Sequence, residues 1–161
     1  MRLTISVVVI VFIHLGCAAQ IDRGKFRNFT KQTIERDGTA GYYDNVVRKY
    51  FKRGQWQEGK KVLDKGMESY YWLSSLNELE GQYWLHYRQY DKARYYLIRS
   101  LKDDASNTHS KEMLAKIEEE TKNYSAAIVY INELLEANPY NYSLWKKKIS
   151  LYRLQGNNEE A

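Results

Sequence analysis

The chain has 161 residues, a formal net charge of +5 and 43% hydrophobic residues, a composition typical of a folded domain. Its only cysteine is Cys17, which excludes an intramolecular disulfide, so the fold must be held together by packing. The mild positive charge favours solubility over nucleic-acid binding, and we expect no nucleic-acid partner.

Residues 1–19 have the pattern of a signal peptide. Arg2 provides a positive start, and residues 3–15 form an apolar run that is too short for a typical transmembrane helix. Cys17-Ala18-Ala19 places small residues where a signal peptidase reads, so we expect cleavage before Gln20. Two alternatives stay open, an uncleaved anchor and lipidation of Cys17, because Leu15-Gly16-Cys17 resembles a bacterial lipobox. All three predict that the chain leaves the cytoplasm.

Residues 20–39 are expected to form a capping segment for the helices that follow. Phe26, Phe29 and Thr33 share one face of a predicted helix, and Asp37-Gly38 is typical of a helix end. Two phenylalanines exposed to water would forgo favourable burial. A short capping helix is therefore favoured over a disordered tail.

From residue 40 onward, apolar residues recur at helical spacing between turns. The pattern predicts three helix pairs, over residues 41–52 with 57–68, 75–87 with 91–102, and 109–121 with 125–137. A further helix follows Asn138-Pro139 and ends at Gly156, because proline cannot continue a helix and glycine commonly ends one. We expect Asp91, Ser125 and Ser143 to be N-caps.

Three columns of residues recur along these helices every 34 positions. Small residues stand where two close-packed helices would cross: Gly59, Ala93, Ala127 and Ala161. Large aliphatic residues follow the first three of them by four positions: Leu63, Leu97 and Ile131. The turn positions have the same spacing: Gly54, Arg88, Lys122 and Gly156.

Over residues 40–161 the chain resembles the tetratricopeptide-repeat family. Trp145, Tyr152 and Ala161, preceded by Pro139, match the family's Trp, Tyr, Ala and Pro positions. The resemblance implies an all-α solenoid of antiparallel helix pairs, a right-handed superhelix of about three and a half repeats. The expected units are 40–73, 74–107, 108–141 and an incomplete 142–161. Because the last unit has only its first helix, we expect the native chain to continue beyond Ala161.

In this family the first helices of successive repeats line a groove in which partners bind. Carried over by phase, the groove would be formed by nine residues: Asn45, Arg48, Phe51, Glu78, Gln82, Leu85, Glu112, Lys116 and Glu119. Lys146 and Arg153 would extend it. The mixture of charged and apolar groups suits a protein or peptide ligand. The Lys and Asn pair that clamps a C-terminal carboxylate in some members is replaced here by Asp44 and Arg48, so that activity is not implied.

No residue pattern predicts catalysis, a cofactor or a metal site. His86 and His109 lack acidic or cysteine partners at zinc-site spacing, and we expect both on the surface. Glu118-Glu119-Glu120 and Lys146-Lys147-Lys148 are interpreted as solvated charge runs. No glycine-rich segment carries the Lys-Ser/Thr of a phosphate loop. The protein is therefore not expected to be an enzyme.

Tyrosine is unusually frequent, with 15 residues. Most tyrosines fall in packing columns, where an aromatic ring fills helix crossings. Five do not, and they are candidates for surfaces that stack against a peptide or a sugar: Tyr42, Tyr70, Tyr95, Tyr140 and Tyr142.

These observations favour an exported scaffold that binds a protein or peptide partner in the periplasm or at the outer membrane. One alternative is the periplasmic arm of a larger outer-membrane barrel protein that transports polysaccharide. Another is an assembly factor anchored by a lipid on Cys17. Membrane attachment would come from that lipid or from a part of the chain beyond Ala161.

Overall fold

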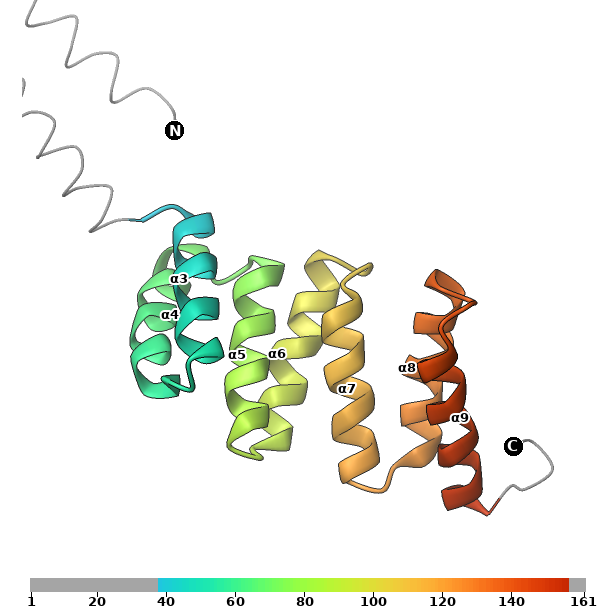
Figure 1. Cartoon of the computed structure of the whole chain (residues 1–161). Helices are drawn as coiled ribbons and strands as arrows, with labels where there is room; N and C mark the ends of the chain where they lie inside the picture. The colour runs from blue at the N-terminus through green and yellow to red at the C-terminus, as the bar shows by residue number, and fades with distance from the viewer. Residues whose placement is uncertain (1–37, 157–161) are drawn as a thin grey trace, which may run out of the picture. The chain divides into compact units, whose positions relative to one another are not determined.

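The computed structural model of the chain describes residues 38–156, and within them it contains α-helices and no strand (Figure 1). The helices are α3 (Ala40–Lys52), α4 (Trp56–Tyr70), α5 (Ser74–His86), α6 (Tyr90–Asp103), α7 (Thr108–Glu120), α8 (Tyr124–Ala137) and α9 (Tyr142–Gln155). The expected signal peptide and most of the expected capping segment lie outside the described residues.

The helix boundaries repeat with the same period as the sequence columns. Helices α3, α5, α7 and α9 each begin 34 residues after the one before, and so do α4, α6 and α8. The first six helices begin and end within two residues of the predicted limits. The antiparallel pairs follow one another from α3 to α9, and the first helices α3, α5 and α7 contact each other in sequence (Figure 1).

The turn after each of the first helices α3, α5, α7 and α9 has a left-handed residue. Gly54, Arg88, Lys122 and Gly156 have φ values of 73°, 54°, 62° and 86°. Glycine adopts this conformation without penalty, whereas a residue with a Cβ atom does so at a cost. All four turn positions therefore share the same left-handed backbone conformation. Two of them are glycine, and two are a strained basic residue.

The small and aliphatic columns form the core, as predicted. Gly59, Ala93 and Ala127 are buried at the helix crossings, and so are Leu63, Leu97 and Ile131. Closely packed helices need small residues where they cross. At Gly81, for example, a Cβ atom would lie 2.5 Å from Leu97 Cδ2. Three buried clusters lie along the array, the first uniting α3, α4 and α5, the second α6 and α7, and the third α7, α8 and α9.

The predicted N-caps are wrong by two residues. The caps of α6, α8 and α9 are Gln89, Asn123 and Asn141, which puts Asp91, Ser125 and Ser143 inside the first turn. Only Asn141 of these three caps with its side chain, which accepts a hydrogen bond from the N–H of Leu144 at 3.3 Å. Before α6 and α8, the left-handed residues Arg88 and Lys122 turn the chain early, so these two helices start before the residue whose side chain is the better cap. Among the helices of residues 38–156, none combines the length and apolarity needed to cross a membrane.

Candidate partner-binding site

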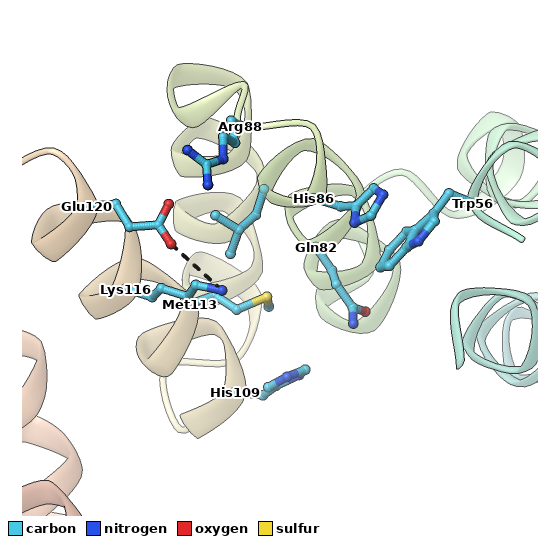
Figure 2. Close-up of a pocket in the computed structure, with 9 residues that line it drawn as sticks. Trp56, Gln82, His86, Arg88, His109, Met113, Lys116 and Glu120 are labelled. Carbon is cyan, nitrogen blue, oxygen red and sulfur yellow. Dashed lines mark ion pairs between the residues drawn. The ribbon is translucent and has the colours of Figure 1, made fainter. Parts of the chain in front are cut away.

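A hollow of about 450 Å³ opens on the face formed by the first helices α5 and α7 (Figure 2). Its walls come from α5, from α7, from the turn after α5 and from the start of α4: Trp56, Gln82, Leu85, His86, Arg88, His109, Met113, Lys116 and Glu120. Leu85 and Met113 provide apolar surface, and the other residues are polar or aromatic. This mixture allows a ligand to bury an apolar group while its polar groups are paired.

Three of the predicted groove residues line this hollow, namely Gln82, Leu85 and Lys116. Four others face solvent elsewhere on the first helices: Asn45, Glu112, Lys146 and Arg153. Glu119 is half-buried and forms an ion pair with Lys147 of α9. Three residues chosen by the phase of the repeat therefore line the hollow, and their role in partner binding stays a prediction.

Phe51 is not a groove residue, which corrects the sequence-based assignment. Its side chain is 5% exposed and belongs to the first core cluster. The ring stacks on Trp56 at a centroid distance of 4.5 Å and covers Gly59, where a Cβ atom would lie 2.7 Å from the ring. A phenylalanine near the end of α3 finds room over a helix that carries no side chain at Gly59, so it packs inward.

Glu78 is also buried, and its carboxylate joins three first helices beside the hollow. Oε1 lies 2.9 Å from Arg48 Nη1 of α3 and 2.9 Å from His109 Nδ1 of α7. Oε2 accepts a hydrogen bond from Asn107 Nδ2 at 2.9 Å. Asn107 is the N-cap of α7, where its side chain accepts from the Ser110 N–H. One buried acid thus fixes α5 against its neighbours on both sides.

The same contacts shift the pKa values of the two ionisable partners in opposite directions. Burial raises the pKa of Glu78, but hydrogen bonds from His109 and Asn107 and the charge of Arg48 outweigh it and lower the pKa to about 2. The hydrogen bond to Glu78 raises the pKa of His109 against the effect of burial. His109 lies on the surface, as expected. Its acidic partner, Glu78, is distant in sequence.

Trp56 and His86 form one wall of the hollow as a parallel stack. Their ring centroids are 3.9 Å apart and the ring planes differ by 12°. On the opposite side, Lys116 Nζ lies 3.8 Å from Glu120 Oε1 (Figure 2). Glu120 Oε2 accepts a hydrogen bond from the Tyr90 hydroxyl at 2.7 Å. The hollow therefore has a rigid aromatic side and a more open charged side.

Part of the wall of the hollow could have been predicted from the spacing of residues in the sequence. His109, Met113, Lys116 and Glu120 stand at helical spacing on one face of α7. His86 and Glu120 occupy equivalent repeat positions, as do Gln82 and Lys116. Trp56 carried no such signal, because it lies at the start of a second helix and reaches the hollow only through its stack on His86.

Buried acids also join the second helices α4 and α6 to the next repeat. Glu118 is buried rather than solvated, and Arg94 Nε of α6 lies 2.7 Å from its Oε1. Glu80 is buried in α5, where Lys60 Nζ of α4 lies 3.1 Å from Oε1 and the Trp84 indole donates to Oε2. Lys60 and Arg94 are equivalent repeat positions. Within residues 38–156, no cluster of three or more His, Cys, Asp or Glu side chains is placed to hold a metal ion.

Several solved structures share this fold, among them tetratricopeptide-repeat domains. The first TPR of Spaghetti (RPAP3), bound to the HSP90 peptide SRMEEVD, is 16% identical with a TM-score of 0.66, covering 73% of this chain and 95% of that one. The Arabidopsis OM64 TPR domain is 13% identical with a TM-score of 0.65, covering 71% and 94%. MamA AMB-1 is 19% identical with a TM-score of 0.65, covering 75% and 66%.

These similarities establish the fold of the described residues, an all-α tetratricopeptide-like solenoid of helix pairs. No protein-family model matches the sequence, and no curated protein matches it.

Proposed function

We propose that the chain is a scaffold that binds a protein or peptide partner in the hollow between α5 and α7. The observation that carries the proposal is the hollow of about 450 Å³ on two adjacent first helices, which has polar anchors beside apolar surface. One solved protein with the same fold is bound to a peptide, which supports a peptide or protein as the ligand.

The hollow can accept one or two side chains of a partner segment. An apolar side chain would contact Leu85 and Met113, while Gln82 and Lys116 would hold the polar groups beside it. Glu78 keeps the walls in place before binding, because it ties α3, α5 and α7 together. Such preorganisation reduces the entropy lost on association.

Partner capture from the native source tests this proposal. Gln82→Ala combined with Lys116→Glu should abolish capture, because the double variant removes one anchor and reverses the charge of the other. Both side chains lie outside the core clusters, so helicity should not change. Lys61→Glu, a charge reversal on the exposed side of α4, is the matched control and should capture normally. Undiminished capture by the double variant would contradict the assignment of the hollow.

The second part of the proposal is that the scaffold works in the periplasm or at the outer membrane. Its support is the signal-peptide pattern of residues 1–19. The intact mass of the protein isolated from its native source provides the test. A mass that begins at Gln20 supports a cleaved and exported protein, and an acylated Cys17 supports lipid anchoring. An unmodified chain that begins at Met1 and remains in the cytoplasm would exclude export.

A further inference from the structure

Aromatic rings form a continuous row outside the hollow. The row begins at Tyr42 and Tyr43 of α3, whose centroids are 5.5 Å apart. It continues from Tyr43 to Tyr70 of α4 at 6.3 Å and from Tyr70 to Trp72 at 6.2 Å. Tyr71 follows at 5.1 Å from Trp72. No residue of this row lines the hollow, so the row is a separate feature of the surface.

Arg99 of α6 extends this row to a further tyrosine. Its guanidinium carbon lies 5.8 Å from the ring centroid of Tyr71 and 5.7 Å from that of Tyr95. Tyr71, Trp72 and Tyr95 are 56%, 53% and 57% exposed. We define these three rings and Arg99 as the aromatic–arginine patch. Tyrosine, tryptophan and arginine are the side chains most enriched where binding energy concentrates in protein interfaces.

The patch is held in place by hydrogen bonds to one backbone carbonyl. Tyr71 O accepts from Arg99 Nη2 at 2.9 Å and from Asn77 Nδ2 at 2.8 Å. Asn77 is fully buried, so the connection between α4 and α5 is anchored from inside the fold. A backbone segment and a guanidinium that are already fixed lose little freedom when a partner binds.

The positive charge of Arg99 is not neutralised within the described residues. Its hydrogen-bond acceptors are neutral, the Tyr71 carbonyl and the Tyr95 hydroxyl, and residues 38–156 place no carboxylate within ion-pair distance of it. The other basic residues that tie helices together all contact acids: Arg48, Lys60, Arg94, Lys111 and Lys147. A fixed arginine between exposed rings is therefore complementary to an anionic group.

We propose that the aromatic–arginine patch is a second interaction surface, which binds an acidic polypeptide segment that carries an aromatic or aliphatic side chain beside its carboxylate. The carboxylate pairs with the free N–H groups of Arg99, and the apolar side chain packs on Tyr71 and Trp72. Because the patch shares no residue with the hollow, a scaffold with both surfaces can hold two partners at once.

The geometry of the rings suits an aromatic side chain. Tyr71 and Trp72 meet at 84°, and Tyr70 and Trp72 at 66°. Rings at such angles offer both edges and faces, and aromatic pairs form edge-to-face as well as offset-stacked. A second copy of this chain is disfavoured as the occupant, because a symmetric contact would bring two Arg99 side chains together and three rings cover far less than the roughly 800 Å² that each partner buries in a stable interface.

The test uses the full chain and a defined probe, the random 4:1 copolymer of glutamate and tyrosine. Poly-glutamate of the same length and alginate are the comparison ligands, measured by biolayer interferometry at physiological salt. The chain should bind the copolymer about tenfold more tightly than poly-glutamate, a difference of about 1.4 kcal/mol. Arg99→Gln should weaken copolymer binding about tenfold, and Arg99→Lys should lie between it and the native chain.

Two further variants separate the patch from general charge attraction. Tyr71→Ala with Trp72→Ala should reduce copolymer binding to the level of poly-glutamate. Lys102→Gln removes an exposed cation one turn from Arg99 and should change binding less than about twofold. Circular dichroism verifies folding, and where Arg99→Gln loses helicity, Arg99→Lys carries the test.

Three results would overturn the proposal. Equal losses in Arg99→Gln and Lys102→Gln would mean that the net charge alone attracts the acids. Alginate bound as tightly as the copolymer, with the same sensitivity to the variants, would assign the patch to an acidic sugar. A stable dimer in light scattering that the Tyr71 and Trp72 variant dissolves would assign it to a second copy. None of these results changes the outcome of the test of the hollow, which uses other residues.

Discussion

Lys122 shows how a single backbone angle limits the stability of one repeat. Its φ of 62° is costly for a residue with a Cβ atom, whereas glycine occupies the equivalent turn at Gly54 and Gly156. Lys122→Gly should therefore stabilise the protein by about 0.5–1 kcal/mol, the left-handed penalty less the entropy of glycine. Lys122→Ala keeps the strain and should be neutral. Urea unfolding measures both.

A glycine substitution within a helix is the control for this gain. Lys61→Gly lies on the exposed side of α4 and should destabilise by about 1 kcal/mol. A loss of stability in Lys122→Gly as well would show that the turn does not hold the left-handed conformation in solution.

Phe51 provides a second prediction for a single residue. Its ring fills the space over Gly59 and stacks on Trp56, so Phe51→Ala should lower the free energy of unfolding by about 3–5 kcal/mol. Lys49→Ala, on the exposed side of the same helix, should change it by less than about 0.5 kcal/mol. Thermal unfolding distinguishes the two. If Phe51→Ala left the free energy of unfolding nearly unchanged, this side chain would have to lie in the groove and not in the core.

At the crossing of α7 and α8, added side-chain volume should lower the stability of the protein. Ala127 is fully buried there, so Ala127→Leu should cost about 1–3 kcal/mol by overpacking. Val129→Leu, on the exposed side of α8, adds bulk at no such crossing and should stay within about 0.5 kcal/mol. Equal effects in chemical denaturation would mean that the 34-residue phase is misplaced.

The buried ion pairs that join neighbouring helices differ in physical origin from the helix crossings at small residues. Crossings at Gly59, Ala93 and Ala127 depend on the absence of side-chain volume, which the periodic sequence displays directly. Glu80 and Glu118 depend on a basic residue of the preceding second helix, and only the packing of the repeats brings the two groups together. Removing one member of such a pair leaves a buried charge, which is more costly than the pair is stabilising.

At the scale of the whole described array, Glu78 and His109 make stability depend on pH. The pKa of Glu78 is lowered to about 2, so its contribution is present above its unfolded pKa of about 4.3 and is lost as the pH falls toward 2. The pKa of His109 is raised, so its contribution is complete below about 6.5 and is lost as the pH rises through the folded value. Both contributions are complete together only between about pH 4.3 and 6.5.

His109→Gln isolates this linkage, because other titrating groups cancel between the two proteins. The native chain should exceed the variant in stability by less than about 1 kcal/mol near pH 5.5, since His109 is half exposed, and this difference should shrink by about pH 9. In a Glu78→Gln background the difference should no longer shrink as the pH rises, because the hydrogen bond that raises the pKa of His109 is gone. With Glu78 present, a difference that grows as the pH rises would contradict the ion pair.

The sequence by itself determined the period, the helix boundaries and the buried columns. These follow from spacing within a helix and from residues whose size or backbone freedom is a local property, as at Gly54, Ala93 and Leu97. It also located part of the hollow, because Gln82, Leu85 and Lys116 follow from the phase of the first helices.

Only the tertiary structure decided which polar groups meet and which aromatic rings stay outside. Glu78 contacts residues about 30 positions away in both directions along the chain, and Arg99 reaches Tyr71 across two helices. Phe51 turns inward because Gly59 leaves room for it, although its helical phase placed it outside. Such contacts depend on how neighbouring repeats pack and on which side-chain rotamers the packing allows. Residue spacing along a single helix determines neither of them.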